Sequence, residues 1–399
     1  MSVETEQTAS GQKLVKLTPK GDRWVRTGHP WIFQNDLAEQ ELSWTGEMVQ
    51  VQASNAEPLG QAFYNANSKI TLRWVTRDPA AVVDRVFWAH RLDQAIAYRN
   101  SVVADSNAYR LIHAEADGFP GLIVDRYADH LVVQSLSLGI DQQMEEILPL
   151  LIERLSPQSV IARNDSPVRK REGLEPGKTV LFGEQPEIIE ILEGNIKFRV
   201  DPWNGQKTGA YLDQRENRLW AAGQARGRVL DACAYQGGFA LRMAAKADSV
   251  LALEDSQAAI EVLEQNIKLN GLSNVEVRKD NIFNALKEMQ LSGERFDQIV
   301  LDPPAFAKSK REVPGALRGY REINRRALQM LQPGGMLITC SCSFAISESD
   351  FVQILREAAQ GVGRVVRLIE KRTQGKDHPI LLTHPESHYL KCFVLQVVD

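Results

Sequence analysis

The sequence is poor in cysteine and has no long apolar run. Four of its 399 residues are cysteine, too few for a disulfide framework in a chain of this length. It contains no C-x-x-C pair, and Cys233 and Cys392 stand alone, so we expect no metal site. No apolar stretch is long enough to cross a bilayer, and the polar start MSVETEQTASGQ lacks a signal-peptide core. These absences predict a cytoplasmic protein with reduced thiols and no membrane partner.

Neither sign of charge dominates the chain. The net charge is -4 at pH 7, which excludes a protein covered with basic charge but leaves room for local phosphate contacts. Basic residues nevertheless gather in three places, each of which fits either a solvated face or a contact with nucleic acid. The N-terminal basic cluster is Lys13, Lys16, Lys20, Arg23 and Arg26; the central one is Arg163, Arg169, Lys170 and Arg171; the C-terminal one is Lys308, Lys310, Arg311, Arg318, Arg321, Arg325 and Arg326.

The residue pattern changes along the chain and predicts three domains after a flexible tail over residues 1–11. Short alternating runs separated by Gly, Asn and Pro predict a small β-barrel over residues 12–80, with Trp31 and Phe33 in its core. Residues 81–185 combine helical patterns at 82–102 and 142–155 with strand-like runs, which predicts a mixed α/β domain.

Residues 186–399 have a regular rhythm of strands and helices. Such alternation predicts a parallel sheet covered by helices on both faces, an α/β fold of the doubly wound kind. Two β-type runs near the end, 364–372 and 389–398, are expected to form an edge hairpin. The alternating strands are predicted at 228–233, 249–255, 274–280, 296–302 and 335–343.

The predicted strands end in acidic residues and one cysteine. In sheets of this kind, ligands bind beyond the carboxyl ends of the strands, where the strand order reverses. The turn after the first strand, DACAYQGGFAL, has only Gly237 and Gly238 and no G-x-G-x-x-G, so a dinucleotide is poorly supported. S-adenosylmethionine, which has no phosphate, fits better. Glu254, 23 residues beyond Asp231, would then bind the ribose hydroxyls and Asp280 would face the adenine.

The fourth of these strands is followed by VLDPPAFAKSK. Two consecutive prolines after Asp302 hold the chain in an extended, stiff turn just beyond the sheet. Such a turn suits a wall that holds a planar substrate beside a methyl donor.

With these motifs the sequence resembles the bacterial large-subunit (23S) ribosomal RNA 5-methylcytosine methyltransferases, which combine a PUA domain, a central α/β domain and a class I methyltransferase domain. GHPWIF resembles the PUA segment, AEADGFPGLIVDRY the central domain, and NGQKTGAYLDQRENR the stretch before the cofactor fold. DPPAFAKSK and TCSCS are similar to the fourth and sixth methyltransferase motifs. The resemblance implies cofactor contacts from Lys207, Asp213, Arg215, Asp231, Ala232, Tyr235, Gly237, Glu254, Asp255, Ser256, Asp280, Asn281 and Asp302.

Methylation of cytosine at carbon 5 needs a helper because this carbon is a poor nucleophile. A thiolate that adds to carbon 6 makes carbon 5 enamine-like, and cysteine reaches the thiolate state near neutral pH. In RNA 5-methylcytosine enzymes the nucleophile lies in a T-C-S motif at a fixed distance after a Gly-Gly turn. Cys342, seven residues after Gly335, has that spacing and is the expected nucleophile. Cys340, deeper on the same strand, is the alternative, and packing by both cysteines is a third interpretation.

The expected partner is large-subunit ribosomal RNA with an unstacked or single-stranded target base. Asp302 would bind the cytosine edge, and a homodimer is left open. Two other functions are kept: an exocyclic-amine methyltransferase that uses the Asp-Pro-Pro turn without a thiol, and an RNA-binding assembly factor without activity. The expected RNA contacts are Lys20, Arg23, Arg26, Lys308, Lys310 and Arg311.

Overall fold

The computed structural model describes residues 13–307 and 309–399. The predicted tail 1–11, residue 12 and Lys308 lie outside the described residues, as does the side chain of Lys310. The chain divides into two compact units and passes between them several times. The first comprises the described residues up to Ile189 with Val200–Ala210 and Asp377–Ser387; the second comprises Glu190–Arg199, Tyr211–Lys376 and His388–Asp399. No helix within the described residues has the length and apolarity to span a membrane.

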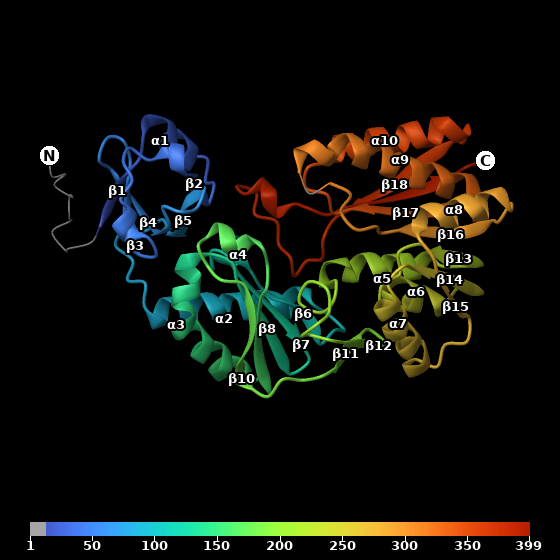
Figure 1. Cartoon of the computed structure of the whole chain (residues 1–399), viewed down its shortest axis with the longest axis horizontal. Coiled ribbons are helices and arrows are strands. Elements are labelled where there is room, and N and C mark those ends of the chain that lie inside the picture. The colour runs from blue at the N-terminus through green and yellow to red at the C-terminus, as the bar shows by residue number, and fades with distance from the viewer. Residues whose placement is uncertain (1–12, 308) are drawn as a thin grey trace. The chain divides into compact units, whose positions relative to one another are not determined.

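The first unit begins with a five-stranded sheet in the order β1-β3-β4-β5-β2 (Figure 1). All five strands lie within residues 12–80, where the sequence predicts a β domain: β1 (Leu14–Lys16), β2 (Trp31–Phe33), β3 (Met48–Gln52), β4 (Pro58–Tyr64) and β5 (Ile70–Thr76). Ile32 and Leu72 are completely buried in its core. Trp31 and Phe33 were predicted in this core and are half-buried instead, because both point away from the face that Ile32 occupies.

A short helix, α1 (Pro19–Val25), was not predicted. It begins at Thr18, whose Oγ1 accepts a hydrogen bond from Gly21 N at 3.0 Å, and Pro19 occupies its first position. The helix carries Lys20 and Arg23 of the N-terminal basic cluster.

A second five-stranded sheet follows in the same unit, in the order β10-β9-β8-β7-β6. Its core includes Trp88 and Phe119, which stack with ring centroids 5.4 Å apart. The two predicted helices are confirmed, whereas the short helix α4 and the strand β10 were not predicted. The elements are α2 (Arg85–Val102), β6 (Ala108–His113), β7 (Leu122–Tyr127), β8 (His130–Ser135), α3 (Leu138–Leu155), β9 (Ser159–Asn164), α4 (Val168–Arg171) and β10 (Gly177–Gly183).

The second unit contains a hairpin and a seven-stranded sheet. The hairpin joins β11 (Ile189–Glu193) and β12 (Ile196–Val200), and the sheet has the order β15-β14-β13-β16-β17-β19-β18. The predicted strands are confirmed as β13 (Arg228–Asp231), β14 (Ser249–Glu254), β15 (Val275–Lys279), β16 (Phe296–Leu301) and β17 (Leu331–Ser341). These five run parallel.

The two last strands, β18 (Val366–Arg372) and β19 (Lys391–Val397), pair antiparallel as expected. Of these two strands only β18 lies at an edge of the sheet, because β19 inserts between β17 and β18.

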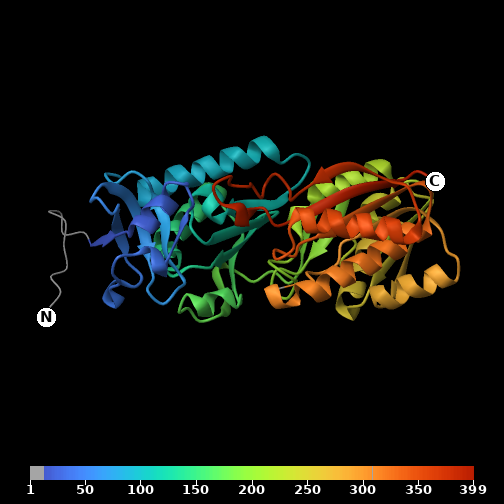
Figure 2. The ribbon, with the colours of Figure 1, turned by 90° about the horizontal axis from the view of Figure 1, so that it is seen from above.

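Helices cover both faces of this sheet and confirm the predicted α/β class. One face carries α5 (Arg215–Gln224), α6 (Gly238–Ala244) and α7 (Gln257–Leu269) (Figure 1). The other carries α8 (Ile282–Leu291), α9 (Val313–Met330) and α10 (Glu348–Val362), of which α9 and α10 lie side by side (Figures 1 and 2). Tyr320, Leu328 and Phe351 from this second set are completely buried against the sheet.

Candidate active site

Adjacent parallel strands of the second unit end in polar side chains. The strand order reverses between β13 and β16, where Asp231 pairs with Val300 in register, and this reversal is where α/β sheets hold their ligands. The side chains are Asp231 at the end of β13, Glu254 at the end of β14, Asp280 after β15, Asp302 after β16 and Cys342 after β17.

Asp231 is completely buried at the centre of this edge. Its Oδ2 accepts a hydrogen bond from Ala240 N at 2.9 Å, in the first turn of α6. Burial raises the pKa of Asp231 to about 7, and the charge of Asp302 adds to the rise, while the Ala240 N–H opposes it. A carboxyl group with such a pKa can become charged when a cation binds nearby.

The loop after β13 is joined to the end of β14 by Glu254. Its Oε2 accepts a hydrogen bond from Tyr235 N at 2.8 Å, and its Oε1 accepts from Asp255 N at 3.0 Å and Ser256 N at 2.8 Å. Oε2, which accepts only one of these hydrogen bonds, has a further lone pair, so the side chain can also accept a hydroxyl group such as that of a ribose.

Two residues of this loop have backbone angles that few residues adopt. Tyr235 has a φ of 49° and Gly237, the N-cap of α6, has a φ of 92°. A Cβ at Gly237 would lie 2.5 Å from Cδ1 of Leu263, so both φ and space require glycine. Ala232, earlier in the loop, donates its N–H to Val300 O at 3.0 Å.

The acids beyond β14 and β15 lie beside helix N-termini. Asp280 forms an ion pair with Arg278 at 2.7 Å and accepts a hydrogen bond from Asn281 N at 2.8 Å. Asn281 caps α8 by accepting from Phe283 N at 3.0 Å, and Ser256 caps α7. Asp255 is exposed. The side-chain oxygens of Asn281 and Ser256 therefore fix the first turns of α8 and α7 at this edge of the sheet.

Asp213, just before α5, and Arg215, the first residue of α5, are both buried. Asp213 Oδ2 accepts a hydrogen bond from the Tyr389 hydroxyl at 2.8 Å, and Arg215 forms an ion pair with Glu216 at 2.9 Å. Lys207, the third residue that the resemblance implied here, belongs to the first unit.

Cys342 is half-buried at the start of a loop that several side chains hold in place. The buried Lys391 ammonium donates to Ser343 O at 2.8 Å and to Ile346 O at 3.0 Å. The hydroxyls of Tyr320 and Ser343 are hydrogen-bonded at 3.0 Å. Burial lowers the pKa of Lys391, and the charges of Cys342 and Glu348 oppose this. The loop therefore sets Cys342 near a buried cation.

Cys340 lies in a different environment, two residues earlier. It is completely buried on β17, directly opposite the buried Cys392 of β19. A hydrogen bond with the Cys392 thiol and burial raise the pKa of Cys340 well above the ordinary range of a thiol. This environment disfavours a thiolate.

Asp302 acts electrostatically on its neighbours across the strand ends. Its negative charge contributes to the raised pKa values of Cys233 and Tyr211, for which burial is the largest cause. The ring of Tyr211 lies 5.2 Å from that of Tyr235, edge to face. Tyr211 thus lies at the same edge of the sheet as Asp302 and Cys342, whose charges both affect it.

Acids near and far in sequence pair with part of the N-terminal basic cluster. Lys20 pairs with Asp36 at 2.9 Å, and Arg26 pairs with Asp22 at 2.8 Å and with Glu57 at 2.7 Å. Arg23 is exposed, and no ion pair to it is found within the described part of the chain.

The other two clusters differ from each other. In the central cluster Arg163 and Arg169 are buried, where they pair with Asp165 and Asp141, so these two guanidinium groups are internal rather than a surface patch. In the C-terminal cluster Arg321 pairs with Glu357 at 2.8 Å, whereas Arg311 is exposed.

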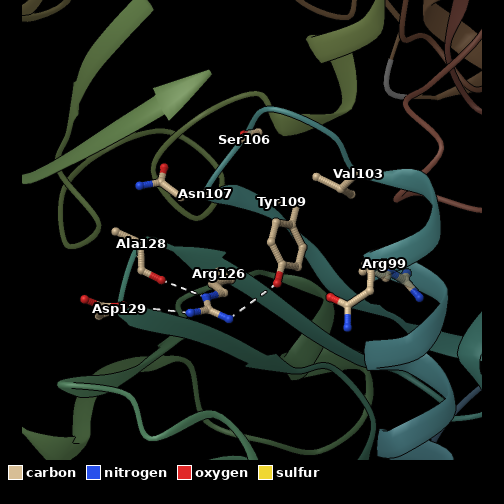
Figure 3. Close-up of a pocket in the computed structure, with 9 residues that line it drawn as sticks. Arg99, Val103, Ser106, Asn107, Tyr109, Arg126, Ala128 and Asp129 are labelled. Carbon is tan, nitrogen blue, oxygen red and sulfur yellow. Dashed lines mark hydrogen bonds and ion pairs between the residues drawn. The ribbon is translucent and has the colours of Figure 1, made fainter. Parts of the chain in front are cut away.

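A pocket of about 390 Å³ lies in the first unit (Figure 3). The Arg126 guanidinium on its wall donates to Ala128 O at 2.7 Å and to the Tyr109 hydroxyl at 3.5 Å. Asn107, Asp129 and Arg99 complete much of its polar lining. The lining has no thiol, so carbon 5 chemistry by a cysteine has no nucleophile there.

Sequence reasoning missed Lys391, Tyr320 and Tyr211 as parts of this edge. The signal for Lys391 was present, since a lysine inside the apolar run YLKCFVLQVV is out of place unless it has a buried partner. No motif marks Tyr320 on α9, whereas Tyr211 lies within NGQKTGAYLDQRENR, where the resemblance implied only Lys207, Asp213 and Arg215.

Two family models match the sequence. Residues 159–380 match the S-adenosylmethionine-dependent methyltransferase family, and residues 15–77 match PUA-like domains.

Named relatives match over nearly the whole chain. "Ribosomal RNA large subunit methyltransferase I" of Aliivibrio fischeri is 39% identical over 389 residues, which cover 94% of this chain and 97% of the relative. The protein of the same name from Aeromonas hydrophila is 41% identical over 379 residues, which cover 92% and 95%.

Solved structures share the fold. A proposed S-adenosylmethionine-dependent methyltransferase from Streptococcus mutans superposes with a TM-score of 0.82 at 20% identity, over 96% of this chain and 100% of that one. A proposed methyltransferase complexed with SAH has the same TM-score at 19% identity, over 96% and 99%.

Proposed function

Because the chain belongs to the S-adenosylmethionine-dependent methyltransferase family and aligns almost end to end with ribosomal RNA large subunit methyltransferase I proteins, we propose that it methylates carbon 5 of a cytosine in large-subunit ribosomal RNA. The observation that carries the choice of carbon 5 is Cys342. This half-buried thiol follows β17, next to the strand that Asp302 follows.

The strand ends of the second unit fit the chemistry of S-adenosylmethionine. Glu254 would accept the ribose hydroxyls, Asp280 with Asn281 would face the adenine, and Asp231 with the Tyr235–Gly237 turn would surround the methionine part. Asp255, Ser256, Ala232, Asp213 and Arg215 would complete this binding site. When bound, S-adenosylmethionine supplies an electrophilic methyl group.

The thiol chemistry would run in two stages on the base. The Cys342 thiolate adds to carbon 6, which forms a carbon–sulfur bond and gives carbon 5 the electron density that it needs for methylation. After methylation a base removes the proton from carbon 5, the carbon–sulfur bond breaks, and Cys342 leaves as a thiolate. Lys391 is a positioning residue here, since its two hydrogen bonds hold the loop that follows Cys342.

Asp302 would bind the edge of the cytosine. It follows β16 and stands before Pro303 and Pro304, whose rings leave the turn few conformations. Its carboxylate can accept a hydrogen bond from the exocyclic amine of the base, or share a proton with the ring nitrogen.

The first unit would supply RNA contacts. We propose a PUA-like RNA-binding domain over residues 12–80, a central domain over 81–185 and a methyltransferase domain over 186–399. The match to PUA-like domains supports the first of these, and exposed Arg23 is a phosphate contact of this kind. Arg311, also exposed, would contact an RNA phosphate from the second unit. The target base has to leave its stack to reach the strand ends.

Trapping with RNA that carries 5-fluorocytosine tests the proposal. Fluorine at carbon 5 cannot be removed as a proton is, so the adduct of the Cys342 thiol with carbon 6 would persist. We expect a covalent protein–RNA species with the wild type and S-adenosylmethionine, and none with Cys342→Ala. Full methylation by Cys342→Ala would instead support transfer to the exocyclic amine, and S-adenosylmethionine binding with no methylation of ribosomal RNA would support an assembly factor.

A further inference from the structure

Two buried histidines and a glutamate gather in the first unit although 357 positions separate the two ends of the group. His29 precedes β2, and His384 and Glu386 lie at the short helix η6 (Pro385–Ser387), the small red helix in Figures 1 and 2. We name these three residues the His29 cluster. Both histidines are buried and Glu386 is half-buried.

The spacing of the three ligand atoms suits one small cation. His29 Nε2 lies 3.1 Å from Glu386 Oε2, His384 Nε2 lies 3.7 Å from the same oxygen, and all three atoms lie within 4.8 Å of one another. Tetrahedral Zn²⁺, with bonds of about 2.0–2.1 Å, separates its ligand atoms by roughly 3.3 Å. Small side-chain rotations bring the cluster to that separation.

A second observation points to a ligand. Nε2 of His384 is buried and has no hydrogen-bond partner within the described residues, and the side chain is only 7% exposed. Buried polar nitrogens are rarely left without a partner. This nitrogen faces the same Glu386 oxygen that His29 contacts, at a distance too long for a hydrogen bond.

The groups around the cluster hold the His29 imidazole in place and offset the nearest positive charge. Trp31 N donates a hydrogen bond to Nδ1 of His29 at 3.1 Å, which fixes the ring with Nε2 towards Glu386. Glu115 and Glu172 pair with the neighbouring Arg73 at 3.0 and 3.1 Å and offset its charge.

We propose that His29, His384 and Glu386 form a Zn²⁺ site that fastens the segment Asp377–Ser387 to the N-terminal sheet. Two imidazole nitrogens and one carboxylate are a donor set that suits Zn²⁺ better than the oxygen-seeking ions Mg²⁺ and Ca²⁺. The site is independent of methyl transfer. The sequence predicted no metal because it has no closely spaced cysteines and histidines of the kind that mark zinc sites, and the two histidines of this cluster lie far apart in the chain.

Zinc stoichiometry and affinity test the proposal with untagged full-length protein. The protein is stripped with a chelator, its thiols are blocked, and Zn²⁺ is titrated in competition with a chromophoric chelator. We expect one Zn²⁺ per chain, with affinity lowered at least about tenfold in His384→Gln and in Glu386→Gln. His90→Gln is the matched control, because His90 is exposed and outside the cluster, and it should bind as the wild type does.

A second readout separates a built site from surface binding. Co²⁺ in the same site should give visible absorption bands that are lost in Glu386→Gln, and Zn²⁺ should raise the melting temperature of the wild type but not of that variant. S-adenosylmethionine binding by each variant confirms that it is folded. Zinc binding that is unchanged in both cluster variants, or tighter binding of Mn²⁺ or Mg²⁺ than of Zn²⁺, would overturn the proposal.

Discussion

Cys340 lies directly opposite Cys392 across the antiparallel pair of β17 and β19, with both side chains completely buried. Cys342 lies one residue beyond the end of β17 and is half-buried. Two cysteines that are almost adjacent in sequence therefore differ in access to substrate. This difference, rather than their spacing, separates a packing role from a nucleophilic one.

Replacing the packing cysteine should leave the chemistry intact. We expect Cys340→Ala to form the adduct with 5-fluorocytosine RNA and to keep most of its activity, while losing roughly 1–2 kcal/mol of unfolding free energy through the small cavity. Cys342→Ala should instead lose activity by on the order of 10³-fold or more without a comparable loss of stability. Urea unfolding and methyl transfer measured on both variants check this, and an inactive, stable Cys340→Ala would reverse the assignment.

Lys391 should affect the reactivity of Cys342 rather than cofactor binding. Lys391→Met removes two hydrogen bonds and a buried cation near the thiol, so we expect roughly 10–100-fold slower turnover and adduct formation that requires higher pH. The Kd for S-adenosylmethionine should stay unchanged.

The control for Lys391 is Lys371→Met, on the neighbouring edge strand β18. Lys371 is exposed and pairs with Glu348 at 2.6 Å, so its loss should change little. A pH profile of adduct formation identical in Lys391→Met and wild type would argue against the positioning role.

Asp231 predicts a pH dependence of cofactor binding. Its pKa is raised to about 7, so below that pH the carboxyl is neutral and attracts a cationic ligand less. We expect the affinity for S-adenosylmethionine to fall as the pH drops below about 7, and Asp231→Asn to bind weakly with little pH dependence. Calorimetry on both sides of this pH measures it, and a flat wild-type profile contradicts the prediction.

The same raised pKa affects stability. The folded state holds the Asp231 proton more tightly than the unfolded state, whose pKa is near 3.8. The contribution of this group to stability is therefore greatest below pH 3.8 and decreases as the pH rises through about 7, by on the order of 4 kcal/mol in total. Asp231→Asn should lack this decrease in chemical-denaturation curves recorded at several pH values.

Replacing Gly237 should destabilise the protein for two reasons, its positive φ and the lack of space for a side chain. Gly237→Ala adds a Cβ 2.5 Å from Leu263 at a φ of 92°, so we expect a loss of roughly 2 kcal/mol or more of unfolding free energy together with weaker S-adenosylmethionine binding. Gly271→Ala is the control, since Gly271 has a φ of 62° but open space around it and should lose only about 1 kcal/mol. Equal losses in the two variants would show that the contact with Leu263 is unimportant.

Arg23 should carry more of the RNA affinity than Arg26. Arg23→Ala should make the slope of log K against log salt less steep by about one unit for a large-subunit ribosomal RNA fragment. Arg26→Ala should change it less, because Arg26 already pairs with Asp22 and Glu57. Filter binding over a series of salt concentrations measures both, and the reverse order would place the RNA elsewhere.

The strands and the α/β class could be predicted from the sequence because alternation and apolar runs are local. The five parallel strands and the two long helices of the first unit follow from such patterns. The helix α1 was missed because the seven residues Pro19–Val25 are too few to show a period. The strand β10, with Gly177 and Gly183 at its ends, has a weak pattern that pairing with β9 overrides.

Ion pairing could not be predicted, because it depends on partners far away in sequence. Asp22 is the only acid among residues 13–35, whereas the fold brings Asp36 to Lys20 and Glu57 to Arg26. The same holds for the His29 cluster. Motifs of a few consecutive residues, such as Asp-Pro-Pro and Thr-Cys-Ser-Cys-Ser, could therefore be recognised in the sequence, whereas sites that folding assembles from distant residues could not.

The insertion of β19 between β17 and β18 affects the order in which the sheet can be completed during synthesis. A ribosome releases β18 before β19, yet β18 has no neighbour in the sheet until β19 arrives. Until then β17, the strand that leads to Cys342, has no partner on the side where β19 will pair with it. An unpaired strand edge is a site for misassembly. The nascent chain should therefore depend on chaperones most in the interval between the synthesis of these two strands.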